Sequence, residues 1–420
     1  MNLFTLSGQN LKARPLNTFM SLLLLTLGVS IISMLLLLNQ QLEDNFNRNI
    51  RGIDLVVGAK GSPLQLILAS VYHIDNPTGN IPLSEARSLM KHPLVEKAIP
   101  QAYGDSYQGY RILGTDTSYV GHYAAEVAEG RLWERSFEVT LGARVAQLLG
   151  LHIGDEFYGQ HGSNENAAEH DEHAYRVVGI LAPSGSVVDQ LILTDLRSVW
   201  EVHAHKGEEK KGEAAAPDHA DHDHAEHEDH AHEALAEEDR DITSLLIKFR
   251  SSMGIMVLPR MINEQTSMQA ALPAFEVNRL LGLFDVGIQG LRAIALAIIV
   301  ISGISVFVSL YNSLKERRYE LALMRSMGAS RGQLLLLLVL EGVLLALLGG
   351  LLGLLLSRGG MWLLSSAVVE DFHYQLSLGN FLVEEIYLLG GALLTGLLAA
   401  SLPAVRAFNL DISETLAEGG

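Results

Sequence analysis

The sequence predicts a membrane protein with four transmembrane α-helices and a large α+β extracytoplasmic domain between the first and second helices. Two observations predict this class. Four long apolar runs occur, one near the start of the chain and three in its last third. The stretch between the first two runs mixes helix-like and strand-like patterns and carries most of the acidic residues. A chain of 420 residues with a formal charge of −18 and a mean hydropathy of +0.22 therefore does not fit one ordinary soluble domain.

Each apolar run is long enough to cross a bilayer, because about 20 mainly apolar residues span a hydrocarbon core of roughly 30 Å. We expect transmembrane helices at residues 16–38, 286–312, 333–356 and 386–408. The first run is longer than the apolar core of a signal peptide, and no small-residue cleavage site follows it. The sequence therefore predicts a retained membrane anchor.

Basic residues in the short loops predict the orientation, since cytoplasmic loops carry an excess of lysine and arginine. The loop 313–332 has five basic residues against two glutamates, whereas the loop 357–385 has one arginine against four acidic residues. We therefore expect segment 1–15, loop 313–332 and tail 409–420 in the cytoplasm. The domain 39–285 and loop 357–385 lie outside, in the periplasm of a Gram-negative cell, which places the chain in the bacterial inner membrane.

The outer domain contains recognisable strand and helix patterns. Residues 51–68 have the β-branched and glycine pattern of a strand and turn, and residues 83–100 that of a short helix leading into a strand, with Ser84 as N-cap. Residues 138–159 predict strand, helix, glycine stop and strand, and residues 174–196 predict two β-rich runs separated by proline and glycine. This mixture indicates an α+β domain.

Several enzyme classes are excluded by what the sequence lacks. There is no cysteine, so disulfides and thiolate chemistry are absent. No G-x-x-x-x-G-K-[ST] motif occurs, and the chain is not expected to hydrolyse ATP itself. No nucleophile elbow, H-E-x-x-H motif or catalytic carboxylate pair stands out. We therefore predict no catalytic residues, no cofactor bound for catalysis and no enzymatic activity.

Several stretches resemble a known family. "EGRLW", "VTLGARVAQLLGLHIGDEFYG" and "YRVVGILAPSGSVVDQLILTDL" are similar to the periplasmic core domain of MacB-type ABC permeases. "KERRYELALMRSMGASRGQ" resembles the FtsX-type permease signature, and "LPAVRAFNLDISETLAEG" is similar to that family's closing segment. Together these matches cover most of the chain apart from residues 203–239.

The resemblance implies a function and a set of partners. It implies a permease that pairs with a second copy or a paralogue and docks on separate ABC ATPase subunits. ATP-driven motion would then be relayed to the periplasmic domain for export, extraction or substrate handling, with a periplasmic binding or adaptor protein as a further partner. The lipid bilayer is the surrounding partner, and nothing in the chain indicates nucleic-acid binding.

The cytoplasmic loop carries the strongest candidate site. Residues 315–330 have the spacing of a short amphipathic helix, Gly328 suits a C-terminal cap, and Ser330 with Gln333 fits a capping box that starts the third span. From the residues alone, the loop could equally be a plain basic loop. The resemblance implies a coupling helix that contacts the ATPase. The residues that it assigns to this contact are Glu316, Arg317, Arg318, Glu320, Arg325 and Gly328.

Polar and small residues inside the spans form a second set. Glu341 lies about a third of the way into the third span, where a carboxylate is costly unless it is paired or protonated. We expect it to pair with Arg406 or to hold the helix bundle together. Small residues at four-residue spacing allow close helix approach, within the chain or between two permeases. These residues are Gly349, Gly353, Ala392 and Gly396.

A histidine-rich insertion interrupts the outer domain. Residues 203–239 contain eight histidines, thirteen acidic residues and three lysines, and this composition predicts disorder without a ligand. Imidazole and carboxylate groups suit Zn²⁺ or another transition metal, at several weak sites. A low-complexity spacer and a charged docking segment are the alternatives. The candidate metal ligands are His219, His222, His224, His227, His230 and His232.

Three functions compete. The first is the permease subunit described above, with a link to zinc or another metal. The second is a non-transporting FtsX-like regulator of a periplasmic partner, and the third is a metal-binding membrane receptor without an ATPase. The size of the outer domain, residues 39–285, favours transport or extraction.

Overall fold

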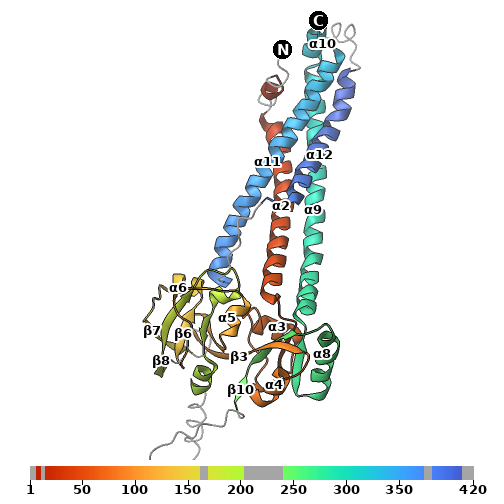
Figure 1. Cartoon of the computed structure of the whole chain (residues 1–420). Helices are drawn as coiled ribbons and strands as arrows, with labels where there is room; N and C mark the ends of the chain where they lie inside the picture. The colour runs from red at the N-terminus through yellow and green to blue at the C-terminus, as the bar shows by residue number, and fades with distance from the viewer. Residues whose placement is uncertain (1–5, 11–14, 161–168, 203–239, 373–380, 409–420) are drawn as a thin grey trace, which may run out of the picture. The chain divides into compact units, whose positions relative to one another are not determined.

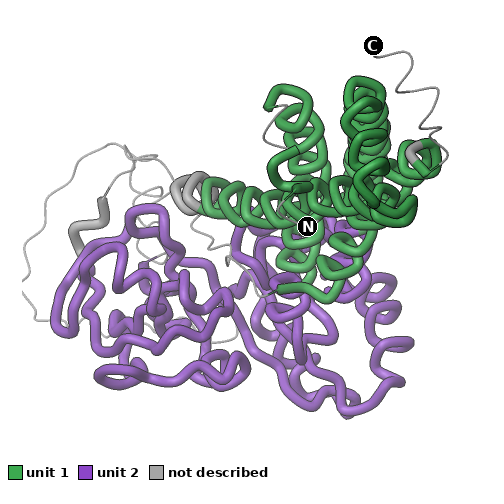
Figure 2. The backbone as a smooth tube through the Cα atoms, turned by 90° about the horizontal axis from the view of Figure 1, so that it is seen from above, with its two compact units in different colours: residues 1–43, 282–420 green, residues 44–281 purple. Residues whose placement is uncertain are grey.

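The chain divides into two compact units (Figure 2). Unit 1 comprises Met1–Glu43 with Gly282–Gly420, and unit 2 comprises Asp44–Leu281. Unit 1 corresponds to the predicted membrane part and unit 2 to most of the predicted outer domain. The residues that the computed structural model describes are 6–10, 15–160, 169–202, 240–372 and 381–408.

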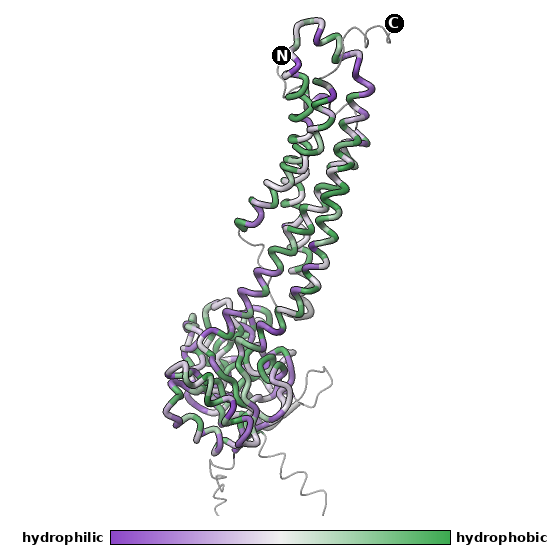
Figure 3. The backbone as a smooth tube through the Cα atoms, turned by 90° about the vertical axis from the view of Figure 1, so that its right-hand side faces the viewer, coloured by the Kyte–Doolittle hydropathy of each residue, from purple (hydrophilic) through white to green (hydrophobic). Residues whose placement is uncertain are grey.

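Unit 1 is built from long apolar helices. Among the described residues, four helices are long and apolar enough to cross a membrane, which confirms the four predicted spans. Leucine-rich runs form helices there because a helix satisfies its backbone hydrogen bonds internally, as hydrocarbon requires. Apolar residues predominate along them (Figure 3). The helices are α2 (Pro15–Ile50), α9 (Pro273–Glu316), α11 (Arg331–Phe372) and α12 (Val383–Phe408), with the short α10 (Arg318–Ser326) between α9 and α11.

All four helices are longer than the predicted spans, α12 by the smallest margin. α2 ends at Ile50, past residue 38, and α9 begins at Pro273, before residue 286. α11 runs to Phe372, so the first part of the predicted loop 357–385 is helical, since no proline interrupts it. With 36 and 44 residues, α2 and α9 exceed the roughly 20 residues that a bilayer needs.

Small residues let α11 approach α2 closely. A Cβ atom added at Gly349 would lie 2.8 Å from a side-chain atom of Leu25, and one added at Gly353 would lie 2.7 Å from the Cβ of Val29. Neither glycine could carry a side chain without separating the two helices. The Gly349-x-x-x-Gly353 pattern therefore serves packing within the chain.

α11 and α12 approach each other in the same way. A Cβ atom at Gly396 would lie 2.5 Å from the Cβ of Ala346 and 2.6 Å from the carbonyl oxygen of Gly342. Ala392, one turn earlier on α12, is 2% exposed and belongs to a cluster with Leu25 and Ala346. The Ala392-x-x-x-Gly396 pattern is thus also an intramolecular contact, and Gly342 is a partner that sequence reasoning missed.

Unit 2 contains a ten-stranded mixed sheet flanked by short helices (Figure 1). The strand order is β12-β1-β11-β3-β4-β9-β6-β8-β5, with β7 pairing β3 and β8. Most neighbours are antiparallel, but β4 with β9 and β6 with β8 are parallel. The strands of this sheet are β1 (Leu55–Ala59), β3 (Val95–Tyr107), β4 (Tyr110–Thr115), β5 (Val127–Gly130), β6 (Glu138–Leu141), β7 (Glu156–Gln160), β8 (Glu169–Leu181), β9 (Ile192–Thr194), β11 (Ser244–Phe249) and β12 (Met268–Ala271).

A short two-stranded sheet and several helices complete unit 2. β2 (Ile81–Pro82) pairs antiparallel with β10 (Asp241–Ile242). Together with the large sheet these elements make the α+β domain that the sequence predicts. The helices include α3 (Pro63–Ser70), α4 (Leu83–Met90), α5 (Ser118–His122), α6 (Ala143–Leu149) and α8 (Met253–Gln265), with the 3₁₀ turn η1 (Val187–Gln190), and residues 196–202 are also helical.

Local sequence signals were right in most places and wrong in two. β6, α6 and β7 follow the predicted order, and Gly150 stops α6 with a left-handed φ of 63°. The segment after β1 was predicted as a turn and is the helix α3, which Ser62 caps by accepting from the Gln65 N–H at 3.4 Å. Ser84 lies inside α4, whose N-cap is Pro82, so the predicted cap was wrong.

The end of α2 and the start of α9 contribute to one hydrophobic cluster of unit 2. Phe46 and Ile50 from the end of α2, and Val277 and Leu281 from the start of α9, pack in this cluster. Its other members come from the sheet, α3, α5, η1 and the connecting loops, and they include the buried Trp133. The two helices that enter the outer domain therefore share its core.

Candidate functional site

The cytoplasmic loop folds as the sequence predicts. α10 is a separate helix, and Gly328 follows it with a φ of 104°, the left-handed conformation that glycine adopts without strain. The Gln333 N–H donates to the Ser330 hydroxyl at 3.3 Å, and the Ser330 N–H donates to the Gln333 side chain at 2.8 Å. This reciprocal pair is the predicted capping box at the start of α11.

α10 has one packed face and one exposed apolar face. Leu321 is 6% exposed and packs in a cluster with Leu314, Leu334 and Ala404, and Met324 lies against it. This cluster holds α10 against the ends of its neighbouring helices. The opposite face carries a stripe of exposed apolar side chains, one turn apart. We call it the α10 stripe, and its members are Tyr319, Leu323 and Met327, exposed by 50%, 45% and 72%.

The charged residues assigned to the ATPase contact lie on α10 and directly before it. Glu316 is the last residue of α9, Arg318 begins α10, and both are exposed, as is Glu320. The Arg317 guanidinium forms an ion pair of 2.8 Å with Glu320, three residues later. Arg325, in the last turn of α10, is half-buried. The structure thus places the six predicted residues on one short segment.

Glu341 is buried in the helix bundle and hydrogen-bonded. Its carboxylate is 3% exposed and accepts a hydrogen bond from the Asn10 side chain. The neighbouring Ser7 is buried and its hydroxyl lies 3.5 Å from the Leu337 carbonyl oxygen. Segment 6–10 is helical and contacts α11 through these groups. Sequence reasoning missed Asn10, because nothing near it in the sequence points to α11.

Arg406, the partner that the sequence suggested for Glu341, has an aromatic neighbour. Its guanidinium lies over the Tyr311 ring, 4.9 Å from the ring centre. Arg331 lies over the Phe408 ring in the same manner, at 5.9 Å. These cation–π contacts link the end of α12 to the end of α9 and the start of α11.

A second buried polar cluster joins α2, α11 and α12. Arg358 and Glu385 form a bidentate ion pair with distances of 2.8 and 2.7 Å, and Glu385 is 2% exposed. The Ser33 hydroxyl lies 2.6 Å from the Glu385 carboxylate and 2.8 Å from the Ser357 hydroxyl. The only sequence signal was that Arg358 is the single basic residue of the predicted loop 357–385.

Within unit 2, the end of α2 is fixed to the domain by hydrogen bonds. Asn49 is 3% exposed, and its side-chain oxygen accepts from the Val187 N–H at 2.9 Å. The Tyr123 hydroxyl donates to the Asn49 carbonyl oxygen at 3.2 Å, and the Tyr72 hydroxyl to that of Phe46 at 2.9 Å. Arg48 donates to the Gly185 carbonyl oxygen at 2.9 Å. The last turn of α2 is therefore held from several sides.

His73, which follows Tyr72 in the chain, is buried. The His73 ring contacts the Tyr103 hydroxyl through one nitrogen and the Tyr119 hydroxyl, at 3.0 Å, through the other. Burial, assisted by the nearby Arg111 charge, lowers the pKa of His73 from 6.5 to about 3. The ring is therefore neutral at physiological pH and serves as a structural hydrogen-bonding centre.

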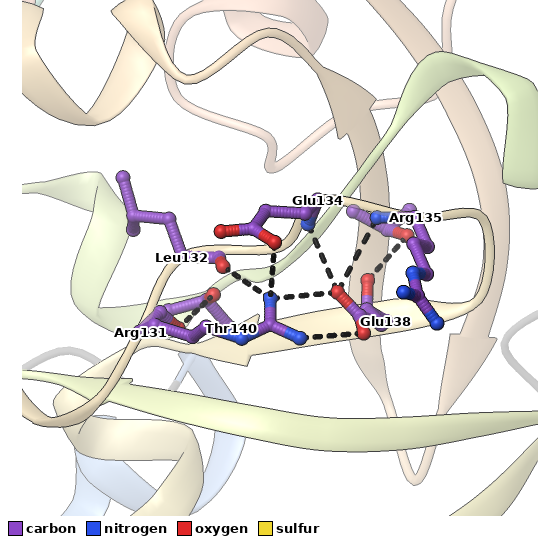
Figure 4. A network of polar contacts seen from close by, with 7 residues as sticks. Arg131, Leu132, Glu134, Arg135, Glu138 and Thr140 are labelled. Carbon is purple, nitrogen blue, oxygen red and sulfur yellow. Dashed lines mark hydrogen bonds and ion pairs between the residues drawn. The ribbon is translucent and has the colours of Figure 1, made fainter.

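The loop that contains "EGRLW" is fixed by an ionic network (Figure 4). The Arg131 guanidinium donates to both oxygens of Glu138, at 2.8 and 2.6 Å, and the Glu134 N–H donates to the same carboxylate at 2.9 Å. The hydrogen bond from Arg131 is the main reason why the pKa of Glu138 falls from 4.5 to about 2, although burial opposes the shift. This network ties the loop 131–135 to β6.

The predicted metal ligands cannot be placed. The six histidines of the insertion lie in residues 203–239, outside the described residues. Within the part of the chain that the structure describes, no group of three or more histidine and acidic side chains is arranged to hold a metal ion. His173, on β8, packs its ring against Phe137.

Comparison with protein families shows the class of protein to which this chain belongs. The model described as MacB-like periplasmic core domain matches residues 18–228, half of the chain, and that described as FtsX-like permease C-terminal matches residues 292–412. The chain belongs to the MacB/FtsX-like ABC transporter permease family. It is a multi-pass membrane protein with a MacB-like periplasmic α+β domain between its first and second spans.

Individual relatives are similar over parts of the chain. The uncharacterized ABC transporter permease YknZ of Bacillus subtilis is 32% identical over 120 residues, 28% of each chain. The macrolide export ATP-binding/permease protein MacB 2 of Aeromonas hydrophila is 34% identical over 125 residues, 30% of this chain and 18% of its own. The uncharacterized ABC transporter permease protein Rv0987 of Mycobacterium tuberculosis is 25% identical over 349 residues, 77% of this chain and 35% of its own.

Among solved structures, the periplasmic region of MacB from Actinobacillus actinomycetemcomitans is similar with a TM-score of 0.32 and 12% identity, covering 55% of this chain and 95% of that one. The chain spans less than a third of the length of YknZ and of MacB 2.

Proposed function

We propose that this chain is the transmembrane subunit of an ABC transporter and that it relays ATP-driven motion of a separate ATPase to its periplasmic domain. The relay would serve export, extraction or handling of a substrate. The chain itself carries out no chemistry in this proposal. Both termini and α10 lie in the cytoplasm, the chain resides in the bacterial inner membrane, and a second copy or a paralogue completes the permease.

The observation that carries this proposal is the continuity of α2 and α9. Each is one unbroken helix that includes a predicted span and also residues of the periplasmic core, namely Phe46 and Ile50 of α2 and Val277 of α9. A helix whose end is held by Asn49 moves with the domain that holds it. Displacement of a span therefore has a direct path to unit 2.

The α10 stripe supports the other end of the relay. Three large apolar side chains exposed one turn apart on a short helix are typical of a protein contact. The capping box and the packed Leu321 hold this helix in place, so that force on it reaches α9 and α11. The neighbouring arginines and glutamates would orient the ATPase.

A pull-down of the detergent-solubilised chain tests this proposal. We expect an ABC ATPase to co-purify with the wild type and to be lost, at least ten-fold, from Leu323→Ala/Met327→Ala and from Arg317→Glu/Arg325→Glu. The matched control is Met253→Ala/Met256→Ala on α8, which removes equally exposed apolar side chains of the outer domain. Retention of the ATPase by the α10 variants would show that α10 is not the coupling site. Absence of any ATPase from the wild type, with crosslinking before solubilisation, would reject the permease function in favour of a receptor.

The metal link in this proposal rests on the sequence of residues 203–239 alone. Eight histidines among thirteen acidic residues supply nitrogen and oxygen donors that suit Zn²⁺. Calorimetry of the wild type and of a chain without residues 203–239 should show Zn²⁺ binding tighter than millimolar only in the wild type. The ATPase activity of the complex, measured with and without Zn²⁺, then decides whether binding matters to the transporter.

A further inference from the structure

A small pocket with a basic lining lies in the outer domain beside the end of α2. Its polar lining is Lys97, Lys248 and His122, and its apolar lining includes Ile99 and Leu246. The cavity measures about 10 Å³, which is room for one water-sized group. All of these residues belong to unit 2.

Two lysines line the pocket, and the charge of one of them, Lys248, is balanced by an ion pair with Glu96. Lys97 and Lys248 are direct partners across the antiparallel strands β3 and β11, next to the apolar pair Ile99 and Leu246. Like charges directly opposite each other destabilise a sheet. Lys248 donates to Glu96 at 2.7 Å and Lys97 to the Ser118 carbonyl oxygen at 3.1 Å. Each ammonium has three N–H donors, so these contacts use one donor of each.

His122 faces the same pocket with an unused nitrogen. Its Nε2 atom is buried and has no hydrogen-bond partner among the described residues, while a hydrogen bond to the Arg51 backbone engages the ring. Burial, followed by the charge of Lys97, lowers the pKa of His122, and Lys248 adds to this effect. The pocket thus lies beside the Lys97 ammonium and contains an unsatisfied nitrogen. Such a buried group in a native protein requires an explanation.

We propose that this pocket binds an oxyanion of the phosphate class. One phosphate oxygen enters the cavity and accepts hydrogen bonds from Lys97 and Lys248, and the remainder of the group lies at the pocket mouth. The proton of hydrogen phosphate lies between a phosphate oxygen and Nε2 of His122. The anion balances the charge of Lys97 and satisfies the buried nitrogen with one ligand.

The pocket lies where α2 joins the outer domain, so a ligand bound there would affect this junction. Gly52, two residues after the end of α2, lines it, and a Cβ atom there would lie 3.1 Å from the His122 ring. A bound anion would therefore tie β3 and β11 to α5 at the point where α2 joins the domain. The site lies wholly within unit 2 and stands independently of the transport proposal.

A phosphate group could come from free phosphate or from a lipid headgroup. The two sources are separable in experiment.

The test measures thermal unfolding of the full chain in neutral-lipid nanodiscs, followed by tryptophan fluorescence, while inorganic phosphate is added. Ionic strength is held constant with a bulky sulfonate. We expect the Tm of the outer domain to rise saturably, by about 3 °C at ten times the Kd. Lys97→Met should abolish the rise and, without phosphate, should be at least as stable as the wild type because the opposed charges are gone. Lys91→Met, which removes an exposed lysine outside the pocket, should keep the rise.

A second arm replaces the neutral lipid with an anionic phospholipid and omits free phosphate. An unchanged Tm assigns the site to free phosphate, and a rise that Lys97→Met abolishes assigns it to a headgroup. No rise with phosphate in the wild type, or an equal rise in wild type and Lys97→Met, would overturn the proposal.

Discussion

Single buried carboxylates show how this protein stabilises charge. Glu385 and Glu341 are 2% and 3% exposed. Glu385 is neutralised by the Arg358 guanidinium, while Glu341 accepts from Asn10. An ionised carboxylate in hydrocarbon is costly without such partners. Loss of the Glu385 carboxylate would therefore leave an arginine charge without its ion partner, whereas loss of the Glu341 carboxylate would leave the neutral amide of Asn10.

Glu385→Gln should strongly destabilise the helix bundle. The substitution keeps the size of the side chain but leaves the Arg358 charge, which is 19% exposed, without its ion partner. Breaking a buried pair in this way costs about 3 kcal/mol or more. Thermal unfolding in detergent measures the loss. Glu384→Gln, on the adjacent exposed residue, is the control, and equal stability of the two variants would contradict a structural role for the pair.

Glu138 should make the outer domain sensitive to acid. Its folded pKa of about 2 lies below the ordinary 4.5, so its contribution is fully present above pH 4.5 and is lost as the pH falls through about 2. Glu138→Gln should be less stable at pH 7 and should lose part of this pH dependence. His73, with a folded pKa of about 3, destabilises in the same direction as the pH falls below 6.5, and this dependence remains in the variant.

Urea unfolding of the full chain at several pH values, followed by the fluorescence of the buried Trp133, measures this effect. Glu129→Gln, an exposed carboxylate on β5, is the control. An unchanged pH profile in Glu138→Gln would show that the Arg131 contact does not contribute to stability.

At the scale of the element, the helices separate into those fixed by local signals and those fixed by packing. α10 and the start of α11 follow from Gly328 and from the Ser330–Gln333 box, which involve residues three positions apart. The contact of α11 with α12 depends on Gly342 and Gly396, which must meet across two helices. The first kind is visible in a short stretch of sequence, and the second is not.

Gly396→Leu should force α12 away from α11. A side chain there would overlap Ala346 and the Gly342 backbone, and overpacking of this kind costs about 1–3 kcal/mol. The fraction of monodisperse protein after graded heating measures the loss. Gly390→Leu on the same helix is the matched control, because no heavy atom lies within 4 Å of a Cβ placed there. Equal heat resistance of the two variants would refute the close contact.

At the scale of the whole molecule, the proposed relay depends on unbroken helices. A Gly-Gly-Ser insertion between Asp285 and Val286 of α9 should leave ATPase binding intact but abolish the response of the outer domain to nucleotide. Hydrogen–deuterium exchange of residues 44–281 in the ATPase complex, with and without an ATP analogue, measures that response. The same insertion after Gly109, in the turn between β3 and β4, is the control. A preserved response in the α9 variant would reject the rigid relay.

The predicted topology is open to a clean test because the chain has no cysteine. Ser251→Cys, in the outer domain, should react with an impermeant maleimide on intact spheroplasts. Ser326→Cys, at the end of α10, should react only after the membrane is permeabilised. Both serines are exposed, so a reversed pattern would overturn the assigned orientation.

The sequence by itself determined the four spans, the α+β class of the outer domain, and the caps around α10. These features depend on hydropathy and on residues a few positions apart, so a single stretch of chain carries the whole signal. It misjudged the segment after β1, because the helix cap at Ser62 was missed, and it placed the cap of α4 at Ser84 instead of Pro82.

Only the tertiary structure decided which polar groups meet. Asn10 and Glu341 are 331 residues apart, Ser33 and Glu385 are 352 apart, and Asn49 and Val187 are 138 apart. The opposed Lys97 and Lys248 likewise meet through the register of two distant strands. Such pairs arise from packing and register, which bring together residues that carry no mutual signal along the chain. The physical reason is that a local pattern fixes an element, whereas a site needs several elements to be in place.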